Sequence, residues 1–396
     1  MAIRVALIGL SASAKTSWAE DGHLPYLHSP QGRAHYTITA LLNSSIEAGE
    51  AAKAHFNLPA SVKTYGDPGA LAADPDVDLV VCNTRVDVHH RTVAPSLAVG
   101  KAAYIEWPLA ESLQASRSLV PAANPNDSLV GLQGRLSPIV QNLRKLLLSG
   151  VIGRVLSSDI RAFESLLPRD VLPKGLAYFA DRQVGGNPVS IAWAHMIDYV
   201  HFVLGKFNSF EGRMQVQRPR VKIEGTSEMI VSDVPDLVTV HGQLDPTTTA
   251  VDVVEDAILS VTFRSGPPFK DAPAFEWTIN GEIGELKIVG PEGPYWNIPS
   301  DSYSDPIRIQ VHPFETNDVH DIPWDWEAWQ KELPSRARLA AAVYEQYATW
   351  VKSGRPVERP EKLIWPKVQD AIIRHEEIAR LFAQYDGKQR QHNGNA

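Results

Sequence analysis

Short apolar runs alternate with amphipathic segments over the first third of the chain. A run that is apolar between its two end residues, such as residues 78–83, predicts a strand covered on both faces, as in a parallel sheet. The runs that predict strands are residues 4–9, 36–42, 78–83, 102–106 and 129–133, and the segments that predict helices are residues 23–27, 46–56 and 90–99. This alternation predicts a Rossmann fold, in which a doubly wound parallel sheet carries helices on both faces.

The pattern changes after residue 153, where strand-like runs follow one another with few helices between them. The strand candidates are residues 155–163, 210–216, 237–244, 257–263, 275–279 and 284–288, with helices predicted at 138–149, 188–204, 336–353 and 368–383. A large, mostly antiparallel sheet backed by helices is the simplest fold for this half. We therefore predict a Rossmann domain at 1–135, an α+β domain at 136–385 whose last helix packs back on the first domain, and a polar tail at 386–396.

Length and composition narrow the class of protein. A chain of 396 residues is too long for one hydrophobic core, which agrees with two domains. The net charge of -8 and the lack of a basic stripe argue against direct binding to nucleic acid. Cys82 is the single cysteine, so neither an internal disulfide nor a thiolate metal cluster is expected. A strand that begins near residue 3 and the absence of long apolar runs predict a cytoplasmic protein without membrane segments.

No metal site is expected from the acidic and histidine clusters. Asp74, Asp76 and Asp78 alternate around a turn without flanking residues to complete a coordination shell. His89 and His90 form a pair, and the sequence offers no third zinc ligand nearby.

The loop after the first predicted strand has some features of a dinucleotide-binding loop. Such loops usually read Gly-x-Gly-x-x-Gly, so that the chain can turn and backbone amides can approach the pyrophosphate. Here Gly9 is followed by the small residues Ser11 and Ala14 near the other two glycine positions. These residues still permit a close approach, and the segment could equally be an ordinary turn between a strand and a helix.

The end of the second predicted strand bears on which dinucleotide would bind. An acidic residue at this point selects NAD because it bonds the ribose hydroxyls. This chain has Asn43-Ser44-Ser45, so no carboxylate repels a 2′-phosphate and the Ser44 hydroxyl can bond one. We therefore expect NADP(H) in preference to NAD(H).

Further motifs resemble, in their order along the chain, those of the Gfo/Idh/MocA oxidoreductases. Residues 84–89 correspond to the family stretch Thr-Pro-Asn-x-x-His, and residues 104–110 contain Glu106-Trp107-Pro108 where the family has Glu-Lys-Pro. Residues 131–138 and 279–286 resemble the strand that crosses into the second domain and a late hairpin. The resemblance implies that Thr84, His89, Glu106 and Trp107 lie beside the nicotinamide end of the cofactor. It also implies a second domain for substrate binding and for pairing into a dimer.

Trp107 is the main departure from the family pattern. The family's lysine reaches the nicotinamide ribose and the substrate, whereas an indole can neither carry a positive charge nor pass a proton. Tryptophan at this position, residues 132–138 and Val234-Pro235-Asp236 resemble the branch of the fungal galactose-regulon repressors, which bind a nicotinamide nucleotide but act as regulators. Trp107 could stack over the nicotinamide or the substrate, or it could be a buried wall residue.

A helix that bears two polar residues is predicted at 188–204. Asn187 can cap it and Pro188 suits its first position. His195 and Asp198 lie one turn apart and match the family's substrate-side histidine and the aspartate that follows it. His195, with an ordinary pKa of about 6.5, could exchange a proton with a substrate hydroxyl, or could be a half-buried histidine bonded to its neighbour. Asp198 could orient the imidazole or serve only as a structural partner.

Lys174 and Tyr178 precede this helix and are candidates to replace the ammonium group of the family's lysine, where this chain has Trp107. Both side chains could face the substrate and replace the family's lysine, or both could be solvated in a loop.

Two functions of different class fit the sequence. The first is an NAD(P)-dependent oxidoreductase that acts on a sugar, a polyol or another small alcohol or ketone. The second is a catalytically silent NAD(P)-binding regulator whose partner is another protein. We favour the enzyme, because a regulator has no need of a histidine preserved on the substrate helix.

Overall fold

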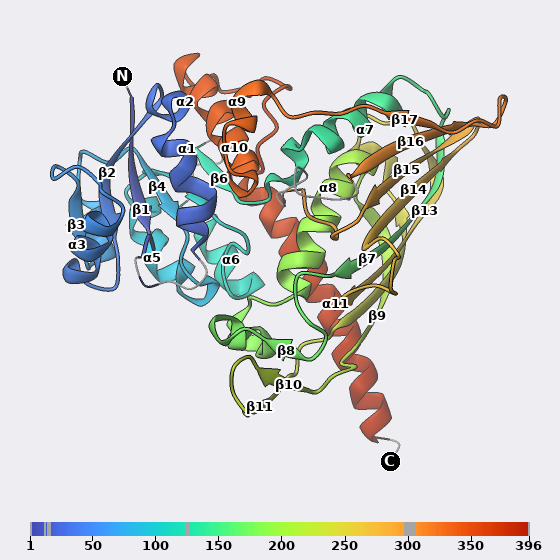
Figure 1. Ribbon diagram of the computed structural model, residues 1–396, viewed down its shortest axis with the longest axis horizontal. Coiled ribbons are helices and arrows are strands. Elements are labelled where there is room, and N and C mark those ends of the chain that lie inside the picture. The colour runs from blue at the N-terminus through green and yellow to red at the C-terminus, as the bar shows by residue number, and fades with distance from the viewer. Residues whose placement is uncertain (1, 12, 14–16, 123–126, 297–305, 395–396) are drawn as a thin grey trace. The chain divides into compact units, whose positions relative to one another are not determined.

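The computed structural model describes residues 2–11, 13, 17–122, 127–296 and 306–394, and its chain divides into two compact units (Figure 1). Each unit is assembled from segments that are distant in the sequence. Unit 1 comprises Met1–Leu136, Gln183–Gly186 and Glu327–His375, and unit 2 comprises Ser137–Arg182, Asn187–Trp326 and Glu376–Ala396.

Unit 1 is built on a six-stranded parallel sheet, which confirms the predicted Rossmann fold. The strands, in sheet order, are β3 (Lys63–Tyr65), β2 (Tyr36–Leu42), β1 (Ile3–Ile8), β4 (Leu79–Cys82), β5 (Ala102–Ile105) and β6 (Ser128–Val130). Every residue of β4 and β5 is buried, as their uniformly apolar sequences predict. The strand order reverses between β1 and β4, and in open sheets of this kind ligands bind beyond the carboxyl ends of the strands at such a point.

Helices cover both faces of this sheet, and one of them comes from late in the sequence. The helical segments of unit 1, with η for 3₁₀ and π turns, are η1 (Ala19–His23), α1 (Leu24–His28), α2 (Pro30–Arg33), α3 (Ile46–His55), α4 (Pro68–Ala72), α5 (Val86–Ala98), α6 (Leu113–Leu119), η2 (Gln133–Leu136), α9 (Ala328–Lys331), α10 (Ser335–Lys352) and η4 (Arg182–Val184), whose first residue belongs to unit 2.

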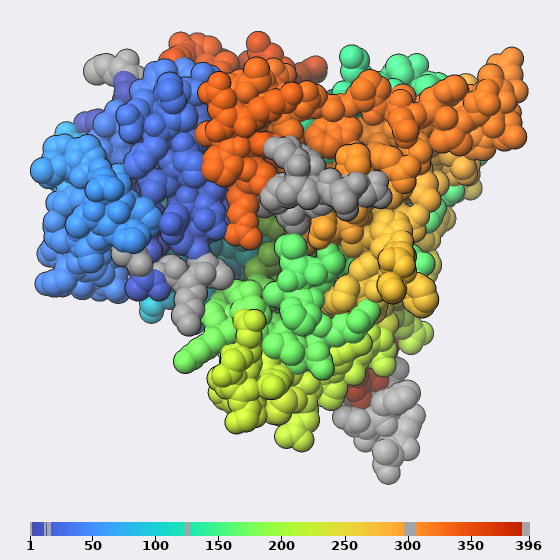
Figure 2. Space-filling model, viewed as in Figure 1, coloured from blue at the N-terminus to red at the C-terminus, as the bar shows by residue number. Residues whose placement is uncertain are grey.

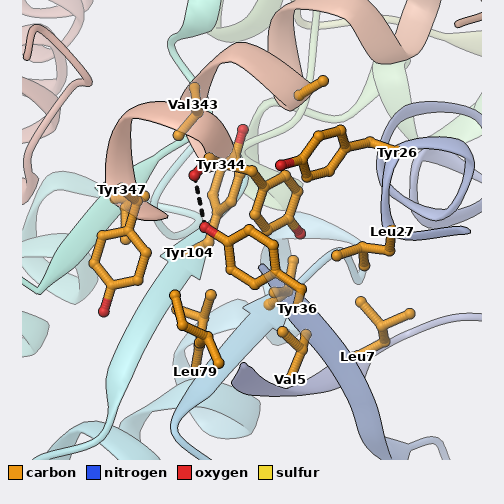
Figure 3. Packing of buried hydrophobic residues seen from close by; sticks show 14 of the residues in the cluster. Val5, Leu7, Tyr26, Leu27, Tyr36, Leu79, Tyr104, Val343, Tyr344 and Tyr347 are labelled. Carbon is orange, nitrogen blue, oxygen red and sulfur yellow. Dashed lines mark hydrogen bonds between the residues drawn. The ribbon is translucent and has the colours of Figure 1, made fainter. Parts of the chain in front are cut away.

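Helix α10 packs into the core of unit 1 through a cluster of tyrosines (Figure 3). The ring of Tyr344 stacks on Tyr26 with centroids 5.3 Å apart and meets Tyr104 edge-on at 5.2 Å. The Tyr36 hydroxyl donates to the backbone oxygen of Tyr344 at 2.6 Å. The sequence analysis placed this helix behind the large sheet, whereas the structure places it in the core of unit 1. An apolar helix face predicts that a helix is covered, but it does not predict which sheet covers it.

Unit 2 contains an eight-stranded sheet that is antiparallel except where β7 pairs with β13, as predicted for this half. The strands, in sheet order, are β17 (His320–Ile322), β16 (Arg308–Pro313), β15 (Gly284–Gly290), β14 (Phe275–Gly281), β7 (Val155–Glu164), β13 (Val253–Ser265), β12 (Leu237–Leu244) and β9 (Phe207–Gln215). The sequence did not predict β16 and β17. Strand β17 is short and largely exposed, so it lacks the apolar alternation on which such predictions depend.

A second, three-stranded sheet of unit 2 was also not predicted. It consists of β11 (Met229–Val231), β10 (Arg220–Ile223) and β8 (Val171–Leu172). Strand β10 pairs with β11 in antiparallel fashion and with β8 in parallel, and the apolar side chains between these strands form a small core of their own.

The other helical segments are α7 (Pro138–Leu148), η3 (Lys174–Ala180), η5 (Val189–Trp193), α8 (Ala194–Leu204), η6 (Pro246–Thr248) and α11 (Val368–Gly394). The predicted helix at 188–204 begins with the π turn η5, which Asn187 caps by accepting from the backbone N–H groups of Val189 and Ser190, each at 3.0 Å. Helix α11 continues to Gly394, well beyond the predicted end at residue 383, through a polar sequence without apolar periodicity. In the part of the chain that the structure describes, no helix is both long and apolar enough to cross a membrane.

Strand β7 ends at a buried acid, Glu164, for which no ion pair is found among the described residues. Glu164 is 4% exposed, and the Tyr295 hydroxyl donates to its Oε2. Burial raises the pKa of Glu164 to about 8, because the charged form loses its hydration. The folded protein therefore keeps a proton here that the unfolded chain releases above its ordinary pKa of 4.5.

This retained proton gives a pH dependence of stability with a definite sign. Between about pH 4.5 and 8 the folded state binds more protons than the unfolded state, so the free energy of unfolding should fall as pH rises, by at most about 1.4 kcal/mol per pH unit from this group. Glu164→Gln imitates the protonated acid and should flatten the profile in this window. Urea unfolding at a series of pH values would measure this. Identical slopes for the wild type and the variant would contradict the protonated state.

Candidate active site

The predicted nucleotide residues of unit 1 gather at the carboxyl ends of β1, β2, β4 and β5. Gly9 follows β1, Ser44 follows β2, Thr84 follows β4, and Glu106 and Trp107 follow β5. Because parallel strands end at one edge, residues far apart in the sequence become neighbours there. We call this group of loops the carboxyl edge of unit 1.

Gly9 is required at the carboxyl edge by both its backbone angle and its surroundings. Its φ is +93°, in the region that L-residues with a side chain rarely adopt. A Cβ at this position would lie 2.8 Å from Thr84 Cγ2 and 3.1 Å from Thr84 N. The loop after β1 therefore runs against the loop after β4, and this approach brings two of the predicted residues together.

The rest of the loop after β1 is held by polar contacts. Asn43 Nδ2 donates to the backbone oxygen of Leu10 at 2.6 Å, which ties the end of β2 to this loop. The Ser11 hydroxyl accepts from the backbone N–H of Ser13 at 3.3 Å. Ala14, which the sequence suggested for this site, lies outside the described residues.

The end of β2 presents hydroxyl groups and no carboxylate. Ser44 is exposed, and the Ser45 hydroxyl caps α3 by accepting from Ala48 N at 3.2 Å. The nearest acid along the chain is Glu47, where a hydrogen bond with Ser45 lowers the pKa of the exposed carboxyl group. The sequence analysis did not consider Glu47, although it follows Ser44 by only three residues.

Two buried side-chain oxygens at the carboxyl edge are unsatisfied. Within the described residues, neither Asn43 Oδ1 nor Asn83 Oδ1 has a hydrogen-bond partner. A buried acceptor without a partner is costly, and at a ligand site a donor on the ligand can remove that cost. Both oxygens lie at strand ends, where a ribose or an amide could supply such a donor.

His89 fixes the loops after β4 and β5 to each other. It is 2% exposed, with Nε2 2.7 Å from the Thr84 backbone oxygen and Nδ1 3.0 Å from that of Pro108. Burial lowers the pKa of His89, although the two carbonyls favour the charged form. Its ring nitrogens are therefore directed at the protein backbone, so His89 positions Thr84 and Pro108 from within.

Cys82 ends β4 just before these residues. The thiol is buried, with Sγ 3.5 Å from Thr92 Oγ1 and 3.7 Å from Thr84 Oγ1. Burial raises the pKa of the Cys82 thiol above its ordinary value, so it stays protonated and unreactive in the folded state.

Glu106 faces the interior of unit 1. The His23 ring joins Glu106 Oε1, 2.9 Å from Nε2, to the Tyr344 hydroxyl, 2.8 Å from Nδ1, and the His23 side chain is completely buried. A side chain at Gly131 would collide with the other carboxyl oxygen of Glu106. His23 and Tyr344 were not predicted, because nothing in the sequence links positions so distant to Glu106.

Trp107 is also buried in unit 1. It is 6% exposed, and its indole lies against His375 with ring centroids 4.6 Å apart. Burial lowers the pKa of His375 to about 3, so this imidazole is neutral near neutral pH. In the described part of the chain His375 Nε2 has no hydrogen-bond partner. His375 is a further residue that the sequence pattern could not assign.

The residues predicted to face the substrate lie in unit 2. His195 and Asp198 are both in α8, where His195 is half-buried and Asp198 is 1% exposed. Lys174 and Tyr178 are in η3, where Lys174 is exposed and the half-buried Tyr178 ring meets Phe179 edge-on at 5.0 Å. The structure thus places these four residues in two separate helical segments of the same unit.

Comparisons with known proteins agree with the two-part build. Residues 3–133 match an oxidoreductase family with an NAD-binding Rossmann fold, and residues 138–290 match the carboxy-terminal domain of Gal80p. The chain is 29% identical to the dehydrogenase aclE of Aspergillus oryzae over 97% of its own length and 99% of that protein. It is 25% identical to the galactose/lactose metabolism regulatory protein GAL80 of Kluyveromyces lactis over 74% of its length and 64% of that protein.

Solved structures show the same fold at low sequence identity. A super-repressor mutant of Gal80p from Saccharomyces cerevisiae superimposes with a TM-score of 0.80 at 22% identity, covering 97% of this chain and 96% of that one. Levoglucosan dehydrogenase in complex with NADH and L-sorbose superimposes with a TM-score of 0.73 at 16% identity, with 98% of each chain covered. Relatives of both kinds, dehydrogenases and regulators, therefore share this architecture.

The contact at Gly9 can be tested against a glycine that has the same backbone strain without the clash. Gly100 has a φ of +81°, and a Cβ there would meet no atom within 4 Å. Gly100→Ala should lower the free energy of unfolding by about 1 kcal/mol, and Gly9→Ala by about 2–4 kcal/mol, because crowding against Thr84 adds to the strain. Urea titrations of the two variants would measure the difference. Equal losses would mean that the loops do not touch as described.

Proposed function

The chain is a member of the Gfo/Idh/MocA oxidoreductase family with a Gal80p-like carboxy-terminal domain, and we propose that it is a cytoplasmic NADP(H)-dependent oxidoreductase. Its substrate would be a sugar, a polyol or another small alcohol or ketone. Dimerisation through the open face of the large sheet belongs to the same proposal. The observation that carries it is the carboxyl edge of unit 1, where Gly9 lies against Thr84 and where Asn43 Oδ1 and Asn83 Oδ1 have no hydrogen-bond partner among the described residues.

The residues at the carboxyl edge suit a dinucleotide. The left-handed Gly9 lets the backbone of the first loop approach a pyrophosphate closely, and Ser11 and Ala14 would follow it along that loop. Ser44 is exposed, and its hydroxyl can donate to a 2′-phosphate. Thr84, held by His89, would lie beside the nicotinamide. The ring of the bound nucleotide would supply or accept the hydride.

His195 is the residue that we propose for proton transfer. When an alcohol is oxidised, the carbon loses a hydride with its electron pair, and the hydroxyl proton must pass to a base. His195 would take that proton and return it in the reverse direction, while the buried Asp198 orients the imidazole. Lys174 and Tyr178 would supply further polar contacts to the substrate.

Trp107 explains why this role would fall to His195. The family's lysine at this position is replaced by an indole that cannot exchange a proton, and the indole is buried against His375. Glu106 is engaged by His23, so it would support this region from within and would not touch the reacting atoms.

A second function is favoured by one specific observation, the match of residues 138–290 to the Gal80p carboxy-terminal domain. In this alternative the chain binds a nicotinamide nucleotide and regulates a protein partner without turnover. A panel of sugars, polyols and ketones, followed at the absorbance of the reduced nicotinamide, would separate the two. Tight nucleotide binding with no turnover on any member would favour the regulator.

Ser44 provides a test of the nucleotide preference. NADPH should raise the melting temperature of the protein more than NADH does, because no carboxylate at the end of β2 repels the 2′-phosphate. Ser44→Asp should weaken NADPH binding about tenfold, and Ser44→Asn, similar in size but uncharged, should weaken it much less. Fluorescence titration of both nucleotides would measure this. An unchanged preference in Ser44→Asp would show that the 2′-phosphate binds elsewhere.

Replacing His195 tests the assignment of the proton carrier. On a substrate that the panel identifies, His195→Ala should lower kcat about 100-fold or more while the Kd of the nucleotide stays nearly constant. His241→Ala removes an exposed histidine of the same unit, hydrogen-bonded to Ser260, and should leave kcat unchanged. Undiminished turnover by His195→Ala would refute the role of His195.

A further inference from the structure

Unit 2 contains a cavity of about 50 Å³ beside its small sheet. The walls are mostly apolar, with Leu172 of β8, Val221 of β10 and Phe179 of η3 among them. In Figure 2 the green segment that carries η3 and the yellow-green hairpin of β10 and β11 adjoin at the surface. All residues around the cavity belong to unit 2, so the inference does not rest on the proposed function.

The cavity has an excess of positive charge. Arg169 and Arg218 line it, and Asp236 is the one carboxylate among the described residues that do so. Asp236 Oδ2 accepts from Arg218 Nη1 at 3.2 Å. Burial, together with the charges of Arg169, Arg218 and Arg161, lowers the pKa of Arg264 nearby. The group of arginines is therefore close enough for its members to repel one another, and an anion would relieve that repulsion.

Several donors at the cavity are not used by the protein. Arg169 donates through Nη2 to the backbone oxygens of Pro267, at 2.7 Å, and Pro268, at 3.2 Å, and its other N–H groups have no partner among the described residues. The Ser265 hydroxyl is buried and likewise has no hydrogen-bond partner in the described part of the chain. A buried hydroxyl without a partner, on a residue that lines the same cavity as two arginines, is a feature that a bound acceptor would account for.

Size and shape restrict the ligand. A volume of about 50 Å³ holds roughly three or four non-hydrogen atoms. A guanidinium group binds a planar carboxylate through two parallel N–H···O bonds. The apolar walls would contact the carbon that follows the carboxylate.

We propose that this cavity binds the carboxylate end of a short-chain aliphatic acid. Arg169 and Arg218 bind the charged oxygens, and the Ser265 hydroxyl donates a further hydrogen bond. Leu172, Phe179 and Val221 pack against the carbon next to the carboxylate, which fills the remaining volume.

Butyrate is the probe for this site, and butyramide, which has nearly the same shape without the charge, is its control. Titration calorimetry on the full chain should show saturable binding of butyrate and none of butyramide. Arg169→Gln should weaken butyrate binding about tenfold or more, the loss expected for a charge-assisted hydrogen bond. Arg220→Gln removes the same charge from an exposed position on β10 that does not line the cavity, and it should bind butyrate like the wild type.

Asp236→Asn should change butyrate affinity in the direction opposite to Arg169→Gln, and it leaves both arginines in place. It takes away the carboxylate that competes for Arg218 while keeping the side-chain shape, so butyrate should bind more tightly. No saturable binding of butyrate, equal binding of butyramide, or weaker binding in Asp236→Asn would each overturn the proposal. Inorganic phosphate that binds as tightly as butyrate would also overturn it, because the apolar walls would then contribute nothing.

Discussion

The buried hydrogen bonds that join Glu106, His23 and Tyr344 constrain the carboxyl edge of unit 1. They link the end of β5 to the segment before α1 and to a helix from late in the chain. A carboxyl group is costly to remove from water unless it is hydrogen-bonded, so these three segments must assemble together. The same contacts fix the backbone of Trp107, which directly follows Glu106. A residue that family resemblance assigns to the cofactor thus has a structural task in this chain.

Much of the fold could be predicted from the sequence, because the apolar runs of β4 and β5 are continuous and the runs of β1 and β2 are mostly apolar and well separated from them. The large sheet followed from the apolar alternation of strands such as β12, whereas β17 lacks that signal. The tertiary contacts could not be predicted, because nothing in the local sequence of α10 indicates which sheet its tyrosines cover. In the candidate site, the asparagine cap and the glycine turn follow from local rules, whereas the partners of Glu106 and Trp107 are distant in the sequence.

In the proposed function, nucleotide binding and catalysis depend on separate features of this chain. The carboxyl edge requires only backbone geometry and small side chains, and these are present in Gly9 and in the Thr84 loop that His89 holds. Proton transfer requires a titratable group, and Trp107 removes the one that the family uses. This separation explains how one architecture serves both dehydrogenases and regulators among the relatives. A chain can lose the reactive group and keep the nucleotide site.

Cys82 is a buried, unreactive thiol that lies next to the carboxyl edge of unit 1. As the single cysteine of the chain, buried at the end of the central strand β4, it is shielded from alkylating reagents in the closed fold. Any modification must wait until the sheet opens locally beside Thr84. The rate at which an alkylating reagent labels Cys82 would therefore measure how often the carboxyl edge opens locally. A ligand that binds at this edge would slow the labelling without contacting the sulfur.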